Sequence, residues 1–259
     1  METVHQCFKE HSAERLRQWV CGWVDATPKG SSAGAVRALI VPGRFDSDSG
    51  PVAAAAFRAV QGEPFDTVAI VASSPVGAFQ RISITEVDAY ETPLGVIRID
   101  DGLRNELCDE DDDIFLSSEG HEHNAGIEAQ LPFLQCVLPG SFGLVPIVMG
   151  WETWDFCREL GSALGEVLSI RNALLIAAAE VRSATQAALA ELVRLLEGLE
   201  VERLSAFLHA QQVELFGVGP VLATLMAAGD LGANRARVVA LRHRADGSAD
   251  LGLLVYRAD

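Results

Sequence analysis

Two histidines separated by a single residue are the side chains whose type and spacing come nearest to a metal site in this sequence. His121 and His123 flank Glu122, and Glu128 follows a few residues later. On a loop, two imidazoles can bind one metal ion, with a carboxylate as an oxygen ligand. The alternative is that these are ordinary polar loop residues, because a His-x-His spacing has little specificity by itself.

A second place where chemistry can be positioned is the polar loop after the apolar run at residues 36–42. This loop carries Arg44, Asp46 and Asp48, and a Ser-Gly-Pro segment ending at Pro51 then opens an alanine-rich stretch. Proline suits the first position of a helix, where its missing N–H costs nothing. A strand, a polar loop and a helix N-terminus in this order are typical of the ligand-binding edge of an α/β sheet.

Short apolar runs and amphipathic stretches alternate along the chain. The runs are rich in Val, Ile and Leu and have the length of strands, and they cover residues 36–42, 67–72, 144–149, 173–179, 236–241 and 252–256. Several are apolar throughout, which is typical of strands covered on both faces in a parallel or mixed sheet. Helical spacing predicts core-facing helix stripes at Leu16, Trp19, Val20 and Trp23, at Leu160, Leu164 and Val167, and at Leu189, Leu192, Leu196 and Leu199. The sequence therefore predicts an α/β fold, a single domain over residues 1–259 with a central, mainly parallel or mixed sheet between helix layers.

Charge and composition exclude several kinds of partner. The 259 residues include 20 basic and 36 acidic ones, which gives a formal net charge of −16. This charge repels phosphate backbones and anionic lipid surfaces, so we expect neither nucleic acid nor membrane as a partner. No window approaches the roughly 18 to 20 apolar residues of a membrane span, and the polar start lacks the order of a secretion signal. We expect a cytoplasmic protein.

Cysteines and the longest acidic run point to no further site. The five cysteines contain no Cys-x-x-Cys pair, which argues against a disulfide framework or a zinc ribbon. We expect most of the thiols to be reduced and some of them to be buried as small apolar side chains, with one reactive thiol as the alternative. The five acids at residues 109–113 lack the spacing of a calcium loop, so we expect a solvated loop or helix start there.

Several motifs, in order and with consistent spacing, resemble those of one known family. The strongest are Tyr90-Glu-Thr-Pro-Leu-Gly95 and Ile127-Glu-Ala-Gln-Leu-Pro-Phe-Leu134. Val145-Pro-Ile-Val-Met-Gly150 and Phe216-Gly-Val-Gly-Pro-Val221 resemble two more of its motifs, and the Ser-Gly-Pro-Val-Ala segment after the loop at residues 43–48 resembles another. On these residues the chain is identified as a member of the Memo family, nearly from end to end. The resemblance implies a single α/β domain similar to class III extradiol dioxygenases.

The resemblance also implies a site at one sheet edge whose metal ligands are two His and one Cys. The corresponding positions in this sequence are Gly43, Pro75 and Phe216. A glycine, a proline and a phenylalanine offer neither an imidazole nitrogen nor a thiolate to a metal ion. We therefore predict that the chain holds no metal at this site and has no cofactor.

Other residues of the family's site are kept. His121, Glu128 and Gln130 match it, and Glu180 conservatively replaces an acid. One interpretation is that His121 and Glu128 are now structural hydrogen-bonding residues. The other is that they belong to a reused polar pocket.

Our hypothesis is a Memo-like protein that has lost the ancestral metal site and is a non-catalytic ligand- or partner-binding protein. The remaining cleft combines both signs of charge with an aromatic floor and is expected to be lined by Arg44, Asp46, Ser74, His121, Glu128, Glu180, Arg182 and Phe216. Such a pocket suits a small polar or zwitterionic molecule, or a segment of a protein partner. We expect Arg182 either to pair with Glu180 or Glu128 or to reach a ligand's carboxylate.

Two other classes of function stay open on the sequence. One is an enzyme with a site rebuilt for new metal ligands or metal-free acid/base chemistry from Asp46, Asp48, His121, His123 and Glu180. No nucleophile with an adjacent base and no phosphate-binding glycine loop supports it. The other is a subunit of a dioxygenase-like complex, a homo- or hetero-oligomer anchored by Trp151 and Trp154, unless these two side chains lie in the core.

Overall fold

The computed structural model describes residues 3–5, 8, 10–28, 34–77, 79, 81–108 and 113–258. Its strands are β1 (Thr3–His5), β2 (Gly34–Pro42), β3 (Thr67–Ser73), β4 (Ile82–Ile84), β5 (Ala89–Thr92), β6 (Gly95–Arg98), β7 (Ile114–Leu116), β8 (Gly143–Met149), β9 (Ala173–Ala184), β10 (Val213–Phe216), β11 (Arg235–His243) and β12 (Ala249–Ala258). Its helices are α1 (Ala13–Ala26), α2 (Ser49–Phe57), the 3-10 turn η1 (Arg58–Val60), α3 (Asp101–Leu107), α4 (Ala125–Glu128), α5 (Leu131–Val137), α6 (Trp154–Leu168), α7 (Gln186–Glu197), α8 (Val201–His209) and α9 (Val218–Asp230).

A mixed sheet forms the centre of the molecule. Within the described residues it has nine strands, in the order β11-β12-β2-β9-β3-β8-β4-β7, and β10 pairs with β9. The central strands β2, β9, β3 and β8 are parallel to one another, whereas β12 joins β2 and β4 joins β8 in antiparallel fashion. A smaller sheet contains β1, β5 and β6. The prediction of an α/β fold with a central, mostly parallel mixed sheet is confirmed.

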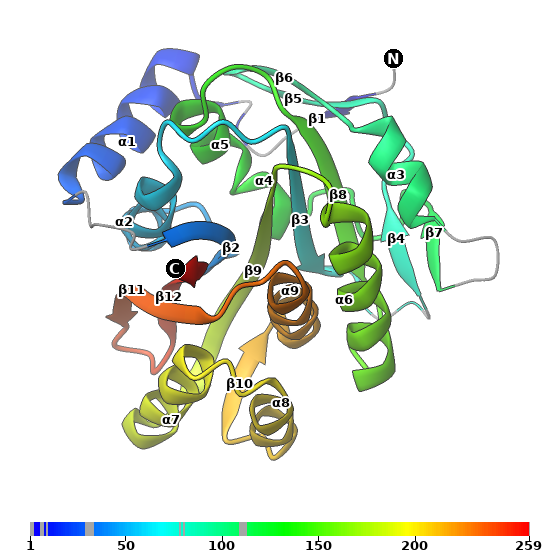
Figure 1. Cartoon of the computed structure of the whole chain (residues 1–259). Helices are drawn as coiled ribbons and strands as arrows, with labels where there is room; N and C mark the ends of the chain where they lie inside the picture. Colours follow the sequence, from blue (N-terminus) through cyan, green and yellow to red (C-terminus); the bar gives the residue numbers. More distant parts are fainter. Residues whose placement is uncertain are drawn as a thin grey trace.

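Helices cover both faces of this sheet (Figure 1). The apolar residues of β2 alternate between the two cores. Ala38 and Ile40 pack in the cluster that includes α6, α7 and α9, and Leu39 and Val41 pack in the cluster that includes α1, α2 and α5. Every residue of β3 is buried, as expected for a strand between two helix layers.

The predicted strands are all present, but two of them are connected differently from the prediction. Residues 236–241 and 252–256 belong to β11 and β12, which form an antiparallel hairpin rather than parallel strands joined through helices. The reason is an Asp-Gly turn, in which Gly247 adopts a φ of 87° that glycine tolerates and other residues disfavour. The strands at residues 36–42 and 173–179 do end at the same edge, because Pro42 lies opposite Ala179.

The edge strand β11 is protected against further pairing. The backbone N–H of Val238 donates to Glu197 Oε1 of α7 at 2.9 Å. The register shifts between Val238 and Ala240, so Val239 forms a β-bulge. Bulges and side-chain caps of this kind discourage an edge strand from pairing with another chain.

Some sequence expectations fall partly outside the described residues. Residues 109–112 of the acidic run lie there, as does Cys7. The described cysteines Cys21, Cys108, Cys136 and Cys157 are free thiols. No helix in the described part of the chain combines the length and the apolar character that a membrane span requires.

Candidate functional site

The carboxyl ends of the parallel strands β2, β9, β3 and β8 meet at one edge of the sheet, where ligands bind in open α/β folds. Around this edge the predicted site residues fall into three environments. We call them the charged cluster, the buried polar group and the edge groove.

Gly43, Pro75 and Phe216, which stand where the sequence comparison expected metal ligands, all lie around this edge. A Cβ atom added to Gly43 would lie 3.3 Å from Glu180 Oε1, and Glu180 lies opposite Phe216 in the β9–β10 pairing. Pro75 is exposed and follows Ser74, which lines the same groove as Phe216.

The side chains at this edge do not fit a metal ion of the family type. Gly43, Pro75 and Phe216 supply no donor atom, and Arg44 Nε lies 3.7 Å from the Glu180 carboxylate. A guanidinium beside this carboxylate competes with any cation for it. Among the described residues, no group of three or more His, Cys, Asp and Glu side chains is arranged to hold a metal ion.

The charged cluster joins the β2–α2 loop to the β11–β12 hairpin. Its centre is Asp250, whose fully buried carboxylate accepts from Arg244 Nε at 2.9 Å and from Ser49 Oγ at 3.2 Å. Arg44 Nη2 lies 3.6 Å from Asp250, and Asp46 Oδ1 lies 3.4 Å from Arg244 Nη2. Two guanidinium groups thus share the carboxylates of two chain segments far apart in the sequence.

Asp46 also caps α2, because its Oδ1 accepts from the backbone N–H groups of Asp48 and Ser49 at 2.7 Å each. Partial burial acts to raise the pKa of Asp46, but these N–H groups and the charge of Arg244 outweigh it and leave the pKa below its usual value. Asp46 is therefore a structural anion, engaged by its own loop.

The buried polar group contains His121, Glu128 and Gln130, all at most 1% exposed. His121 Nε2 lies 3.2 Å from Ser83 O and 3.1 Å from Ser83 Oγ. Burial lowers the pKa of His121 to about 4, against the opposing effect of the Ser83 carbonyl, so the imidazole is neutral at physiological pH. Gln130 Nε2 donates to Pro42 O and Gly126 O, both at 3.0 Å, and so ties α4 and α5 to the end of β2.

The charge of Glu128 acts on another buried side chain, the hydroxyl group of Tyr90. Burial raises the pKa of Tyr90 and the Glu128 charge raises it further, which places the two side chains in one buried environment. His121 and Glu128 thus lie in the interior, beneath the sheet edge.

The edge groove has a volume of about 620 Å³ and is the open space at the ends of β3 and β8. It is lined by Ser73, Ser74, Gly77, Met149, Gly150, Trp151, Glu152, Thr153, His209 and Phe216. Of the eight predicted cleft residues, it contains Ser74 and Phe216. Trp151 is 38% exposed there, whereas Trp154 is half-buried against the core.

Glu152 is the functional candidate that sequence reasoning missed. Its carboxylate accepts from the Ser73 hydroxyl and, at 2.7 Å, from the N–H of Gly219 at the start of α9. Burial raises the pKa of Glu152, although these donors and the N–H of Val218 oppose the shift. The available sequence signal was its place just after an apolar strand, where site residues of α/β folds occur.

Arg182 differs from the sequence expectation. It is exposed, and its guanidinium lies over the Phe216 ring, 4.2 Å from the ring centroid. The arginine that faces Glu180 is Arg44. The β9–β10 pairing skips Arg182, because Leu215 lies opposite Val181 and Glu214 lies opposite Ser183. Beyond Ala179 the strand has also left the buried centre of the sheet, so Arg182 reaches solvent and the aromatic face.

Replacing Arg182 by alanine is expected to lower the free energy of unfolding by only about 0.5 to 1 kcal/mol, the range of an exposed cation–π contact. Urea denaturation measures it. In a Phe216→Leu background the same replacement should have almost no effect, since the aromatic face is gone. A loss of roughly 3 kcal/mol or more, as for a broken buried ion pair, would contradict this geometry.

The residues of the rebuilt-enzyme alternative are spread over different environments. His123 is largely exposed, with its Nε2 3.7 Å from Glu122, whereas His121 is buried. Asp48 pairs with Arg242 at 2.5 Å at the outer side of the charged cluster.

Comparison with known proteins gives a consistent result. The model of the Memo-like protein family matches residues 6–254. A MEMO1 family protein of Methanopyrus kandleri is 30% identical over 220 residues, covering 80% of this chain and 76% of that protein. One from Aquifex aeolicus is 28% identical over 229 residues, covering 85% and 83%. The crystal structure of an uncharacterized protein from Escherichia coli K12 shares the fold, with a TM-score of 0.59 at 15% identity over 85% of this chain and 99% of that one. The chain belongs to the Memo family.

Proposed function

We propose that this chain is a non-catalytic member of its family that binds a small polar molecule or a segment of a partner protein in the edge groove. The observation that carries the proposal is the replacement of the expected metal donors by Gly43, Pro75 and Phe216, with Arg44 3.7 Å from the Glu180 carboxylate.

The edge groove has the chemistry of a recognition site. Trp151 and Phe216 offer apolar surface, and Ser74 and Glu152 offer polar groups, beside the arginine stacked on Phe216. Pockets of roughly 300 to 1,000 Å³ that combine apolar walls with a few polar groups are typical small-molecule sites. The exposed Trp151 is also the kind of side chain that anchors a protein interface.

A metal-free acid/base enzyme is the second candidate, and Glu152 is the observation that favours it. A groove carboxyl group whose pKa is raised by burial holds its proton more readily than a free carboxyl group, which suits a general acid. Among the described residues that line this groove there is no Lys or Arg, and Arg182 lies on the Phe216 ring at its margin, so a cationic or neutral substrate suits Glu152 better than an anionic one.

The purified protein is expected to hold well under one equivalent of iron, copper or zinc, and to gain little thermal stability when these are supplied. Elemental analysis and thermal unfolding measure both quantities. A ligand that binds only the folded state at 100 times its dissociation constant stabilises by about 2.7 kcal/mol, which is the shift to look for.

The matched control is His121→Gln, because His121 is the imidazole that the family's site and this chain share. Stoichiometric metal in the unmodified protein that disappears in this variant would establish a rebuilt metalloenzyme and refute the proposal.

A further inference from the structure

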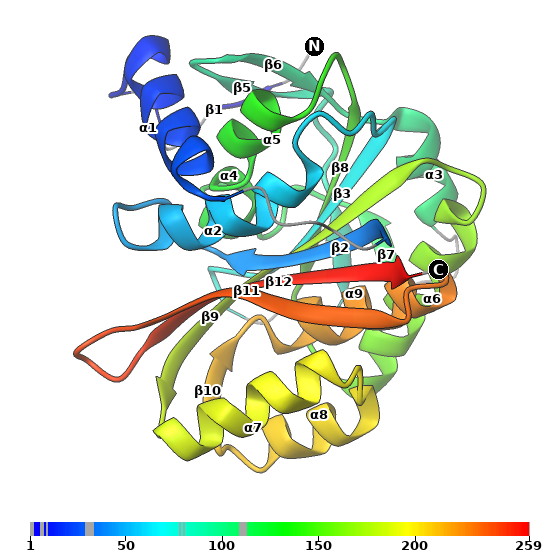
Figure 2. The ribbon, with the colours of Figure 1, turned by 60° about the vertical axis from the view of Figure 1, so that its left-hand side comes forward.

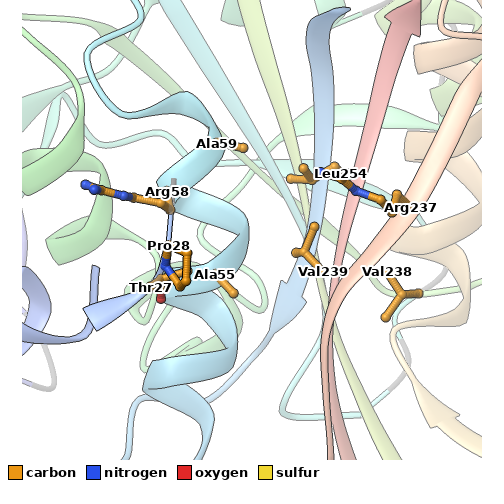
Figure 3. Close-up of a pocket in the computed structure, with 9 residues that line it drawn as sticks. All are labelled: Thr27, Pro28, Ala55, Arg58, Ala59, Arg237, Val238, Val239 and Leu254. Atoms are coloured by element: carbon orange, nitrogen blue, oxygen red, sulfur yellow. The ribbon is translucent and has the colours of Figure 1, made fainter. Parts of the chain in front are cut away.

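A second groove lies between α2 and the edge strand β11, apart from the edge groove (Figure 3). Its volume is about 340 Å³. It is lined by Thr27, Pro28, Ala55, Arg58, Ala59, Arg237, Val238, Val239 and Leu254. None of these residues belongs to the charged cluster, the buried polar group or the edge groove.

The floor of this groove is apolar because of the bulge in β11. Val238 lies opposite Leu253 and Ala240 opposite Gly252, which leaves Val239 as the extra residue. Val239 packs in the same core cluster as Leu254, on the α2 side of the sheet. Ala55 and Ala59 face it across the groove, and these short side chains leave the space open (Figure 3).

Arginines line the α2 side of β11. Arg235 lies opposite Tyr256, Arg237 opposite Leu254 and Arg242 opposite Asp250. Directly opposed residues of an antiparallel pair share a face, and Leu254 and Tyr256 pack toward α2. These arginines therefore point to the α2 side as well.

Only part of this row has acidic partners. Arg242 pairs with Asp48, and Arg244 pairs with Asp250. Within the described residues the side chain of Arg237 has no hydrogen bond or ion pair, and the Arg235 guanidinium donates only to the carbonyl of Asn234, at 3.4 Å.

Arg58, the second arginine that lines the groove, is not available to bind a ligand there. Arg58 is turned away from β11 toward Asp25, 3.7 Å from its carboxylate, whereas Arg237 extends from β11 toward Leu254 and the groove (Figure 3). The unpaired guanidinium thus lies at the apolar floor.

We propose that this groove binds an amphipathic carboxylic acid, a molecule with an apolar chain or ring that ends in one carboxylate. The apolar part lies on Ala55, Ala59, Val239 and Leu254, and the carboxylate accepts from Arg237. A guanidinium presents two parallel N–H groups that match a carboxylate. The nearby Arg235 adds positive charge in a protein whose net charge of −16 otherwise repels anions.

Isothermal titration of the full chain with three probes tests the proposal. Octanoate has both the chain and the charge, octanamide lacks the charge, and acetate lacks the chain. We expect one octanoate to bind per chain and acetate to give no heat. Octanamide should bind at least about ten-fold more weakly than octanoate, since a hydrogen bond to a charged group commonly contributes a factor of ten or more. Equal binding of octanoate and octanamide, or binding of acetate as tight as octanoate, would overturn the proposal.

Two variants locate the site. Arg237→Gln should weaken octanoate about ten-fold while leaving octanamide unchanged, since it removes only the charge–carboxylate contact. Arg203→Gln, at a 75% exposed arginine of α8 that lines neither groove, should leave both affinities unchanged. The proposal fails if octanoate shows no binding at millimolar concentration, or if Arg237→Gln has no effect on it.

Discussion

Replacing Asp250 by alanine is expected to lower the free energy of unfolding by about 3 kcal/mol. The Asp250 carboxylate is fully buried and holds Arg244 at 2.7 Å, with Arg44 at 3.6 Å. Removing one partner of a buried ion pair leaves an uncompensated charge, at a cost of roughly 3 to 5 kcal/mol. The lower end applies here because Arg244 is 18% exposed and keeps some contact with water.

Asp48→Ala is the matched control, since Asp48 also pairs with Arg244, and with Arg242, but is 43% exposed. Exposed pairs contribute about 0 to 1 kcal/mol, so this variant should unfold almost as the unmodified protein does. Guanidinium denaturation at neutral pH measures both variants. Equal losses in the two would show that burial of Asp250 does not govern the strength of the charged cluster.

Acid is expected to destabilise the protein through His121, with a contribution of about 3 kcal/mol between neutral pH and pH 4. The pKa of His121 falls from 6.5 to about 4 on folding. As the pH drops through this window, the unfolded chain takes up a proton that the folded chain does not, so protonation favours unfolding. Below pH 4 both states carry the proton and the loss is complete.

The measurement is the pH dependence of unfolding, compared between variants rather than in absolute terms. His121→Gln removes the titrating group and should flatten the fall in stability between pH 6.5 and pH 4. His123→Gln, at a largely exposed position, should keep the slope of the unmodified protein. A variant of His121 with an unchanged slope would mean that the folded protein accepts this proton readily.

The central strands could be predicted because their physics is local. Residues 68–72 and 173–179 are apolar throughout, and this pattern occurs where both faces of a strand are covered. The short strands β4, β7 and β10 were not predicted. Three or four residues such as Ile82–Ile84 and Val213–Phe216 are too few for any periodicity, and they are strands only because they pair with β8 and β9.

The candidate site could be predicted only in part, because its side-chain contacts depend on how distant strands pair and not on local sequence. The type of residue at Gly43, Pro75 and Phe216 follows from the sequence, whereas the partner of each charge depends on register. Arg44 faces Glu180 through the loop after β2, and Arg182 stacks on Phe216 because β10 places that ring beside β9.

Close packing also decides which polar residues are open to solvent. A Cβ atom on Gly126 would lie 3.0 Å from Ala72 Cβ and 3.2 Å from Ala178 Cβ, so α4 lies directly on β3 and β9. Contacts of this kind, between small side chains far apart in the sequence, leave no local signal. The burial of the neighbouring Glu128 was therefore invisible before the fold was known.

The position of β12 has a consequence for how the chain folds. β12 follows every other strand in chain order, yet it lies inside the sheet between β11 and β2 (Figure 2). The Ser49–Asp250 hydrogen bond spans 201 residues. During synthesis, β2 therefore emerges long before its neighbour exists and has an unpaired edge. Contacts of such long range slow folding and leave strand edges open to aggregation meanwhile, so completion of this sheet is expected to be the late step of folding.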